Sequence, residues 1–550
     1  MKGIHIGTVV GNTSPHEFRF VLRSRAAKMG DLVAVTMEVP AGGYDTFETV
    51  NAWGRIIELD RYNPFLPVEA GQELADEGIK LLDTILSFSR DQTEAKVLVL
   101  GCAAEGDYRT LNPLNYPVNP GAEVILPPAD AVKRILTGDE EVHRLKLGWL
   151  VGRRDVDVEI KTNPIVARHM AILAMTGGGK TVAARRVIRE LLDAKYPMVI
   201  LDPHGDYLGF WAKRELFPKN TIKVFYPHVR VQEETRDLIA YLIREMTQGL
   251  TEPQRDVYEQ ALEQTKIDAD GNEVSVFIDR LFGELENIRT TGNTRLHPGT
   301  IPAVKRGLRI VQGHLEAMKQ SNDRLRDRLK EFPFEPLPDP ITRPYEIVQP
   351  GQASIIYLGG YDHLTQSTMV ALVLKHLFEK RASLSNEIPP LLCVIEEAHN
   401  FIPSAGEGQR NTPSVEIIRK VITEGRKFGV GLLLISQRPS RLDETTLSQC
   451  NTYMIFRLVN PRDQSFVERV MENLSRADSR LLPGFGPGQG IVSGQGVRFP
   501  LLIQVQQDKE LELSNLGDEN FVEQAEKWGS SKQAGAVRRS TAFAKEIDEA

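Results

Sequence analysis

The stretch AILAMTGGGKTVAARRVIRELL, residues 171–192, decides how the central region of the chain folds. A short apolar run leads into three glycines, a lysine and a threonine, and apolar residues then recur at the spacing of a helix. A glycine-rich turn between a strand and a helix lets several backbone N–H groups point at one anion, and the helix N-terminus adds partial positive charge. The stretch therefore predicts a loop that binds the phosphates of a nucleotide.

The side chains of this loop fit a nucleotide bound with Mg²⁺. Lys180 is expected to reach the β- and γ-phosphates, and Thr181 to offer its hydroxyl to Mg²⁺. Ala174 stands where the usual pattern has its first glycine, which requires only that the backbone there stay in the β region. A glycine-rich turn with an incidental lysine is the alternative, but the strand before the turn and the helix after it favour nucleotide binding. The expected nucleotide-binding residues are Thr176, Gly177, Gly178, Gly179, Lys180, Thr181 and Val182.

A second signature is PLLCVIEEAHNF, residues 390–401, an apolar strand that ends in Glu396 and Glu397. In a nucleotide hydrolase, the first acid at such a strand end orders Mg²⁺ and the second polarises the attacking water. A buried strand with solvated acids at its end is the alternative. Because a hydrolase needs both the loop and the acids, the two signatures together predict hydrolysis.

Three further residues are candidates for the same site. Gln437 follows the apolar run 432–435 and is expected to sense the γ-phosphate, although a polar strand end is the alternative. Asp202 ends the strand that follows the loop's helix and is expected near the nucleotide, whereas His204 beside it is more simply a loop residue. Arg426 ends a helix expected at about 412–428, where it either meets the helix dipole or reaches a neighbour's nucleotide as an arginine finger.

The chain divides into regions of different pattern. Residues 1 to about 128 carry short β-branched runs cut by turn residues, typical of a small barrel or sandwich, with one helix expected at 71–88. From about 165, apolar runs alternate with amphipathic stretches, which predicts a parallel sheet with both faces buried. The expected domains are an N-terminal β-barrel and connector at 1–150, a first core segment at 151–210, a helical insertion at 211–345, a second core segment at 346–505 and a C-terminal tail or arm at 506–550.

Composition limits the classes of partner. The net charge is −7, the three cysteines lie far apart, and no signal peptide or membrane span is expected, which indicates a cytoplasmic protein. An acidic chain has no extended basic face for nucleic acid. The negative charge does not exclude nucleic-acid binding, because loops that line a pore can concentrate basic groups, and Arg410 and Asn411 of the segment 403–414 are the candidates for such contacts.

Together these segments resemble the HerA family of hexameric DNA translocases, within the FtsK-like and conjugation-type motor ATPases. The resemblance rests on IHIGTVVGNTSPHEFRF, NPIVARHMAILAMTGGGKT, LDPHGDY, VIEEAHNF, EGRKFGVGLLLISQRP and SQCNTYMIFRL, in family order. It implies an α/β fold, with a RecA-like P-loop ATPase core, an N-terminal β-barrel and an inserted helical subdomain. Besides Ala174, Gly178 departs from the family pattern, because Ser is frequent there.

The resemblance also implies function. It implies an ATP-driven helicase in which six identical subunits form a ring, ATP and Mg²⁺ bind between neighbours, and double-stranded DNA passes through the central pore. Arg426 and Arg168 would then act on a neighbour's ATP. The implied partner is a nuclease such as NurA, in DNA end processing, or an effector subunit in phage defence. Two alternatives stay open: a conjugation-type motor, and a scaffold in which ATP regulates the assembly of an effector nuclease.

Overall fold

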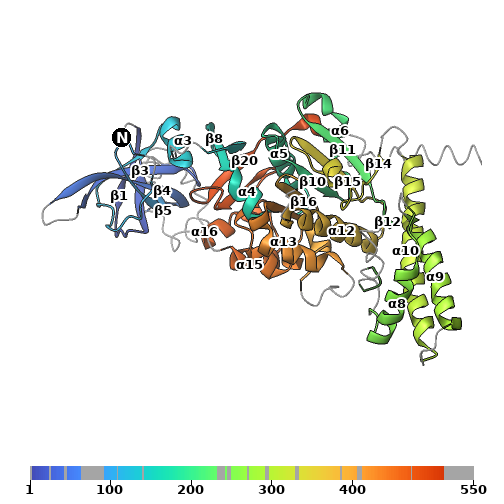
Figure 1. Cartoon of the computed structure of the whole chain (residues 1–550). Helices are drawn as coiled ribbons and strands as arrows, with labels where there is room; N and C mark the ends of the chain where they lie inside the picture. The colour runs from blue at the N-terminus through green and yellow to red at the C-terminus, as the bar shows by residue number, and fades with distance from the viewer. Residues whose placement is uncertain are drawn as a thin grey trace, which may run out of the picture.

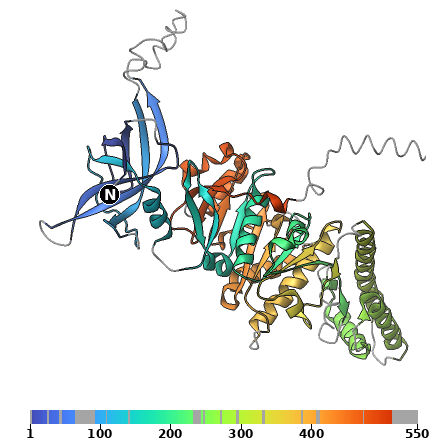
Figure 2. The same cartoon turned by 90° about the horizontal axis from the view of Figure 1, so that it is seen from above.

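The computed structural model places a barrel at one end of the molecule, a bundle of helices at the other, and a large sheet between them (Figures 1 and 2). None of the helices among the residues that the structure describes is long and apolar enough to cross a membrane. The described residues are 3–23, 27–41, 46–63, 92–107, 110–138, 142–231, 242–244, 249–268, 272–291, 297–328, 334–383, 387–404, 412–471 and 474–512.

The N-terminal region is a closed barrel whose six described strands follow the order β1-β2-β5-β4-β3-β6. Neighbouring strands are antiparallel. Because side chains alternate between the two faces of a strand, one set fills the interior, where Phe20, Val33 and Val97 are fully buried. The expected barrel is therefore confirmed. Its strands are β1 (Ile4–Val10), β2 (Glu17–Leu22), β3 (Leu32–Pro40), β4 (Phe47–Tyr62), β5 (Gln92–Ala104) and β6 (Glu123–Leu126).

The central sheet has twelve described strands, of which the first eight in spatial order are parallel and the last four antiparallel. The strand before the glycine-rich loop, β9, lies two places from β16, which carries the acids, with β17 between them. The carboxyl ends of these three strands therefore meet at one edge. In spatial order the strands are β14 (Glu335–Pro336), β11 (Thr221–Tyr226), β15 (Gln352–Tyr357), β10 (Met198–Asp202), β16 (Leu391–Ile395), β17 (Val430–Ser436), β9 (Met170–Leu173), β18 (Thr452–Ile455), β19 (Gln489–Gly494), β20 (Leu501–Val505), β7 (Arg144–Leu150) and β8 (Arg153–Lys161).

Helices cover both faces of the parallel strands, as the continuous apolar runs predicted. Ala171 of β9 belongs to the core formed with α12 (His363–Ala382) and α13 (Ser414–Phe428). Its neighbour Ile172 belongs to the opposite core, formed with α5 (Lys180–Asp193). The α/β fold class with a P-loop-type core is confirmed.

The helices between the two halves of the core form a bundle at the edge of the sheet, next to β14 (Figure 1). They are α8 (Glu252–Gln264), α9 (Val274–Thr291) and α10 (Thr300–Arg328), and they pack on one another through buried apolar side chains. Thr251 and Gln254 form a capping box that starts α8.

The sheet takes strands from two ranges that the sequence assigned to other domains. The strand β7 falls in the range 1–150 but pairs with β20, and β11 falls in the range 211–345 but pairs with β15. Both are short strands inside polar surroundings, so their patterns do not show which sheet they join. We propose that the barrel ends after β6 and that the inserted helices begin after β11.

The barrel is joined to the core by a buried ion pair. Arg55 of β4 and Asp478 are only 1% and 2% exposed, and Arg55 Nη2 lies 2.6 Å and 2.8 Å from the two carboxylate oxygens. Arg55 Nη1 also donates to the carbonyl oxygen of Pro500 at 3.0 Å. A bidentate pair of this kind fixes orientation, so barrel and core are held at a defined angle.

Several sequence predictions lie outside the described residues. They are the helix at 71–88, the pore-loop candidates Arg410 and Asn411, and the tail beyond 512. The remaining described elements are α3 (Ala129–Thr137), α4 (Thr162–Arg168), α6 (Leu208–Ala212), η2 (Arg214–Leu216), β12 (Arg230–Val231), β13 (Asn272–Glu273), α11 (Pro344–Ile347), η4 (Ala398–Asn400), η6 (Pro439–Arg441), α14 (Glu444–Ser448), α15 (Pro461–Val470), α16 (Arg476–Ser479), η7 (Leu482–Gly484) and η8 (Lys509–Leu511).

Candidate nucleotide-binding site

The glycine-rich loop joins β9 to α5, and Lys180 is the first residue of that helix. Gly177 and Gly179 have φ values of 75° and 103°, a region that residues with a side chain rarely adopt. A Cβ on Gly179 would also lie 2.7 Å from the backbone nitrogen of Gly488. Glycine is therefore required at 179 by conformation and by the close approach of a second loop.

Ala174 is fully buried, and its φ is not positive, so its methyl group causes no backbone strain. Its N–H donates to the carbonyl oxygen of Ser436 at 3.2 Å, which keeps this end of β9 beside β17. A Cβ on Gly178 would lie 3.2 Å from the Cβ of Ala174, tighter than ordinary contact. The carbonyl oxygen of Met175 would lie closer still, at 3.0 Å, so backbone and the Ala174 methyl together leave little room for a side chain at 178.

Lys180 meets the acids that follow β16. Its Nζ lies 2.5 Å from Glu396 Oε1 and 2.6 Å from Glu397 Oε1, and all three side chains are at least nine-tenths buried. Burial disfavours the charge of Lys180, but the two carboxylates outweigh burial and raise its pKa above the ordinary value. Burial raises the pKa of Glu396 to about 7, although Lys180 opposes that rise. The structure thus brings the predicted cation and both predicted acids together.

Glu397 has a strained backbone, with φ 51° and ψ 46°. A non-glycine residue in this left-handed region costs of the order of 1 kcal/mol, and such strain gathers at functional sites. The neighbouring His399 lies 3.2 Å from Glu397 Oε2, and burial lowers the pKa of His399 to about 4, so its ring is neutral near pH 7. The strained turn therefore aims one carboxylate oxygen at Lys180 and the other at a neutral imidazole.

The acids also suit a divalent cation. Glu396 Oε1 lies 2.5 Å from Lys180 Nζ and Glu397 Oε2 lies 3.2 Å from His399 Nδ1, and buried carboxylate oxygens of this kind suit Mg²⁺ once Lys180 turns to the phosphates. Within the described ranges, no group of three or more His, Cys, Asp or Glu side chains could hold a metal ion alone. A cation at these acids would therefore share its coordination with the phosphates of a nucleotide.

Gln437 lies between the loop and the acids, because β17 separates β9 from β16. The hydroxyl of Thr176 donates to Gln437 Oε1 at 2.6 Å. Ser436, the last residue of β17, contacts His399 Nδ1 at 3.1 Å through its hydroxyl. The end of β17 thus connects the phosphate-binding loop to the turn that carries Glu397.

Asp202 is fully buried but does not line the cavity beside the loop. Its two oxygens accept hydrogen bonds from four backbone N–H groups of residues 204–207, so it shapes the turn after β10. That turn sends His204 and Asp206 to the cavity wall. It also places Tyr207, whose hydroxyl donates to Glu396 Oε2. Asp202 therefore reaches the site through the loop it organises.

The two arginines assigned to a neighbour's nucleotide lie at the opposite edge of the sheet. Arg168 ends α4 directly before β9, and Arg426 lies in the last turn of α13, before β17. Arg168 donates to Gln495 Oε1, whereas the exposed Arg426 makes no ion pair with another described residue. Neither lines the cavity of its own chain.

The cavity beside the loop measures about 480 Å³. Some of the residues that line it could not be predicted from the sequence. The loop, Glu397 and Gln437 form one side, and Gly488, Gln504 and Gln507 belong to the other. Gln504 and Gln507 could not be recognised as site residues from the sequence, because two glutamines near the end of the core match no motif. Tyr207 could have been found only from its place in the segment LDPHGDY.

Known proteins resemble this chain in sequence over much of its length. Residues 145–377 match the family model "Helicase HerA, central domain". "Probable helicase MJ1565" of Methanocaldococcus jannaschii is 26% identical over 94% of this chain and 94% of its own length. "DNA double-strand break repair helicase HerA" of Pyrococcus furiosus is 27% identical over 76% of this chain and 79% of its own length. The structure of VirB4 of Thermoanaerobacter pseudethanolicus covers 68% of this chain and 99% of its own at 14% identity, but its TM-score is only 0.45, so the fold assignment rests on strand order.

Proposed function

We propose that this chain, an ATP hydrolase whose residues 145–377 match the central domain of the HerA helicases, uses ATP to move along double-stranded DNA as a hexameric ring. The observation that carries this proposal is the contact of Lys180 with Glu396 and Glu397 at the edge of the sheet where the glycine-rich loop opens. A phosphate-binding cation and a pair of acids within reach of one cavity are the components that ATP hydrolysis needs.

The contacts of Lys180 suggest an order of events when ATP binds. Without ATP, the ammonium group pairs with both buried acids. The phosphates, cradled by the backbone N–H groups of residues 176–181, compete for the same ammonium group, because they offer more negative charge. As Lys180 turns to the β- and γ-phosphates, Glu397 is released to orient and deprotonate the attacking water.

Mg²⁺, when bound, would be held by Thr181 and Glu396 and would neutralise charge on the β- and γ-phosphates. Tyr207 keeps the carboxylate of Glu396 in one orientation through its hydrogen bond. We expect Gln437 to exchange its contact with Thr176 for one with the γ-phosphate and so to report whether that phosphate is present.

The ring proposal rests on the position of the arginines. Arg168 and Arg426 cannot serve the nucleotide of their own chain from the opposite edge of the sheet. An arginine at the open face of ATP stabilises the charge that spreads over the γ-phosphate oxygens. In a ring, the edge that carries Arg168 and Arg426 can face the neighbour's cavity, and hydrolysis then depends on assembly.

The DNA proposal rests on relatives that are named DNA double-strand break repair helicases. We place duplex DNA in the central pore and a partner nuclease, such as NurA or a phage-defence effector subunit, on the ring. Arg410 and Asn411 stay our candidates for DNA contact from a pore loop. The second candidate function is a scaffold in which ATP regulates assembly of an effector. The buried, strained position of Glu397 disfavours this function, because a pure switch needs no acid held in place to position water.

The test is ATP turnover with and without long duplex DNA. Duplex DNA is expected to raise turnover, and the stimulation should weaken as salt is raised, because phosphate contacts release counterions. A scaffold predicts turnover that is slow and indifferent to DNA. Equal turnover with and without DNA at every salt concentration would contradict the translocase proposal.

A further inference from the structure

The nucleotide cavity has two walls of different origin. The glycine-rich loop, Glu397 and Gln437 form the first, and Pro487, Gly488, Gln504, Val505 and Gln507 contribute the second. Because the N–H groups of the loop are suited to phosphates, the sugar and base of a nucleotide must lie away from the first wall. The second wall, together with Val182, His204 and Asp206, is the surface left for them.

The second wall is fastened close to the loop. The N–H of Val505 donates to the carbonyl oxygen of Gly488 at 2.9 Å, and that of Gln506 donates to Leu147 of β7 at 2.9 Å. Gly488 approaches Gly179 so closely that a Cβ on Gly179 would overlap its backbone. The distance between the two walls is therefore set by backbone contacts.

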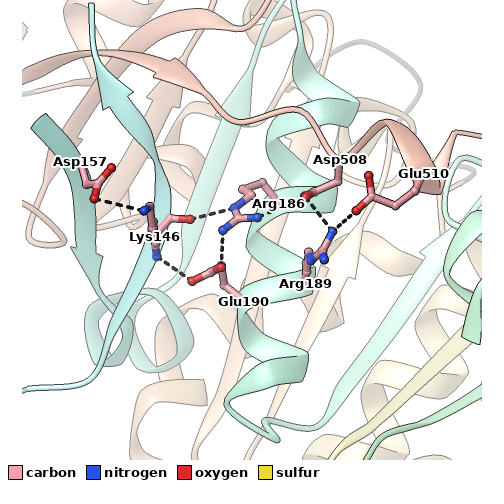
Figure 3. A network of polar contacts seen from close by, with 7 residues as sticks. All are labelled: Lys146, Asp157, Arg186, Arg189, Glu190, Asp508 and Glu510. Carbon is pink, nitrogen blue, oxygen red and sulfur yellow. Dashed lines mark hydrogen bonds and ion pairs between the residues drawn. The ribbon is translucent and has the colours of Figure 1, made fainter. Parts of the chain in front are cut away.

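The residues that follow, 506–512, form a strap across the helix that carries Lys180 (Figure 3). Asp508, 5% exposed, accepts hydrogen bonds at its Oδ1 from Arg186 Nη1 at 3.2 Å and Arg189 Nη1 at 2.8 Å. Arg189 also pairs with Glu510. Both arginines project from α5, so the strap is fixed to the phosphate-binding helix by a buried carboxylate.

Arg186 connects the strap to the rest of the core. It is 6% exposed, donates through Nε to the carbonyl oxygen of Lys146 at 2.8 Å, and pairs with Glu190. Glu190 in turn accepts from the N–H of Lys146 at 2.7 Å. Figure 3 shows α5, β7 and the strap meeting at this side chain.

A second, apolar anchor holds the far end of the strap. Leu511 is fully buried, and a Cβ on Gly209 of α6 would lie 1.9 Å from the carbonyl oxygen of Leu511. The strap is thus fixed at Asp508 and at Leu511, while Gln504 and Gln507 face the cavity just before and beside the first anchor.

We propose that residues 504–507 bind the nucleoside portion of ATP and that Asp508 positions them through Arg186 and Arg189. This inference rests on the proposed ATP site and names the surface that recognises the ligand beyond its phosphates. The amide groups of Gln504 and Gln507 both donate and accept hydrogen bonds, as the hydroxyls of a ribose and the edge of a base require. To bind them, Gln504 Nε2 would exchange its contact with the carbonyl oxygen of Pro487 at 3.3 Å, and Gln507 Nε2 its contact with Glu512 Oε1 at 2.9 Å. Asp508 itself contacts no ligand and acts as a positioning residue.

Binding of two ligands separates this role from a general effect on folding. Titration calorimetry on the full chain with Mg²⁺ compares ATP with inorganic tripolyphosphate, which has the phosphates but no nucleoside. Asp508→Asn keeps the shape of the side chain and removes its charge, and it is expected to weaken ATP about tenfold, the effect of one lost charge-assisted contact. Tripolyphosphate is expected to bind as tightly as to the unaltered chain. Gln507→Ala is expected to give the same pattern.

Asp157→Asn is the matched control, because Asp157 pairs with Lys146 in the same network but contacts no residue of the strap. It should leave both affinities unchanged. If Asp508→Asn does not fold, Arg189→Gln removes the shorter contact to Asp508, retains Arg186, and makes the same prediction. If Asp508→Asn weakens the binding of ATP and of tripolyphosphate equally, or leaves the affinity for ATP unchanged, the inference is overturned. If the unaltered chain binds neither ligand, the ATP site itself is wrong.

Discussion

Lys180→Ala is expected to remove ATP turnover. Among the described residues that line the cavity, Lys180 is the one lysine or arginine, so no other side chain there offers a fixed positive charge to the β- and γ-phosphates. Two charge-assisted contacts at about 1.5 kcal/mol each amount to roughly a 100-fold loss of ATP affinity. Titration calorimetry gives the affinity, and phosphate release gives the turnover.

Lys180→Arg is the control for folding. The alanine variant leaves Glu396 and Glu397 buried without a cation, which destabilises a fold, whereas arginine keeps the charge but not the compact geometry of the ammonium group. The arginine variant is expected to unfold at nearly the temperature of the unaltered chain and still to lose turnover. Normal ATP turnover in Lys180→Ala would contradict the assignment of the glycine-rich loop as the nucleotide-binding site.

The same variant tests the ring when it is mixed with Arg426→Ala. Removing an arginine finger costs about 1,000-fold or more in turnover, so each variant is expected to be inactive alone. A mixed ring contains interfaces that combine an intact Lys180 with an intact Arg426 of the neighbour, and these should recover some of the activity. Mixtures that stay inactive under subunit exchange, or normal turnover by Arg426→Ala alone, would show that Arg426 does not act across the interface.

Glu397→Gln is expected to bind ATP and to hydrolyse it about 100- to 10,000-fold more slowly, the range for loss of a general base. Affinity should be unchanged or somewhat higher, because Lys180 then leaves one carboxylate rather than two when it turns to the phosphates. Single-turnover hydrolysis and equilibrium binding, measured on the same preparation, separate the two effects.

Glu259→Gln supplies the matched control, since Glu259 is an exposed glutamate of α8, in the helical bundle at the edge of the sheet. This control variant is expected to change neither the affinity for ATP nor the rate of hydrolysis. A collapse of ATP affinity in Glu397→Gln, with normal turnover per bound ATP, would assign Glu397 to binding and not to chemistry.

The core of the fold could be predicted from local pattern. The strands β9, β10, β16 and β17 are short, continuous apolar runs between turns, and parallel strands buried on both faces have that pattern. The barrel could be predicted from its short β-branched runs. The assignment of β7 and β11 could not, because membership of a sheet is decided by partners that are distant in the chain.

The candidate site, like the fold, contains residues that could be predicted from the sequence and contacts that could not. The loop and the acids lie at strand ends, where sequence position fixes their place at one edge of the sheet, so their meeting with Gln437 could be expected. Contacts between distant residues could not: Arg55 meets Asp478, and Arg189 meets Asp508, only after the chain has folded. Asp202 was expected near the nucleotide because it ends a strand at that edge. Its carboxylate turned instead to four N–H groups of its own loop.

The central claim, that this chain converts ATP hydrolysis into movement along duplex DNA, is tested most directly by displacement of a third DNA strand. A labelled oligonucleotide is bound as a triplex at a site far from the end of a long duplex, and its release is followed with time. Release is predicted with the unaltered chain and ATP, after a delay that grows with the distance from the end, and none is predicted with Glu397→Gln. A chain that hydrolyses ATP in the presence of the duplex and leaves the triplex intact would contradict the claim.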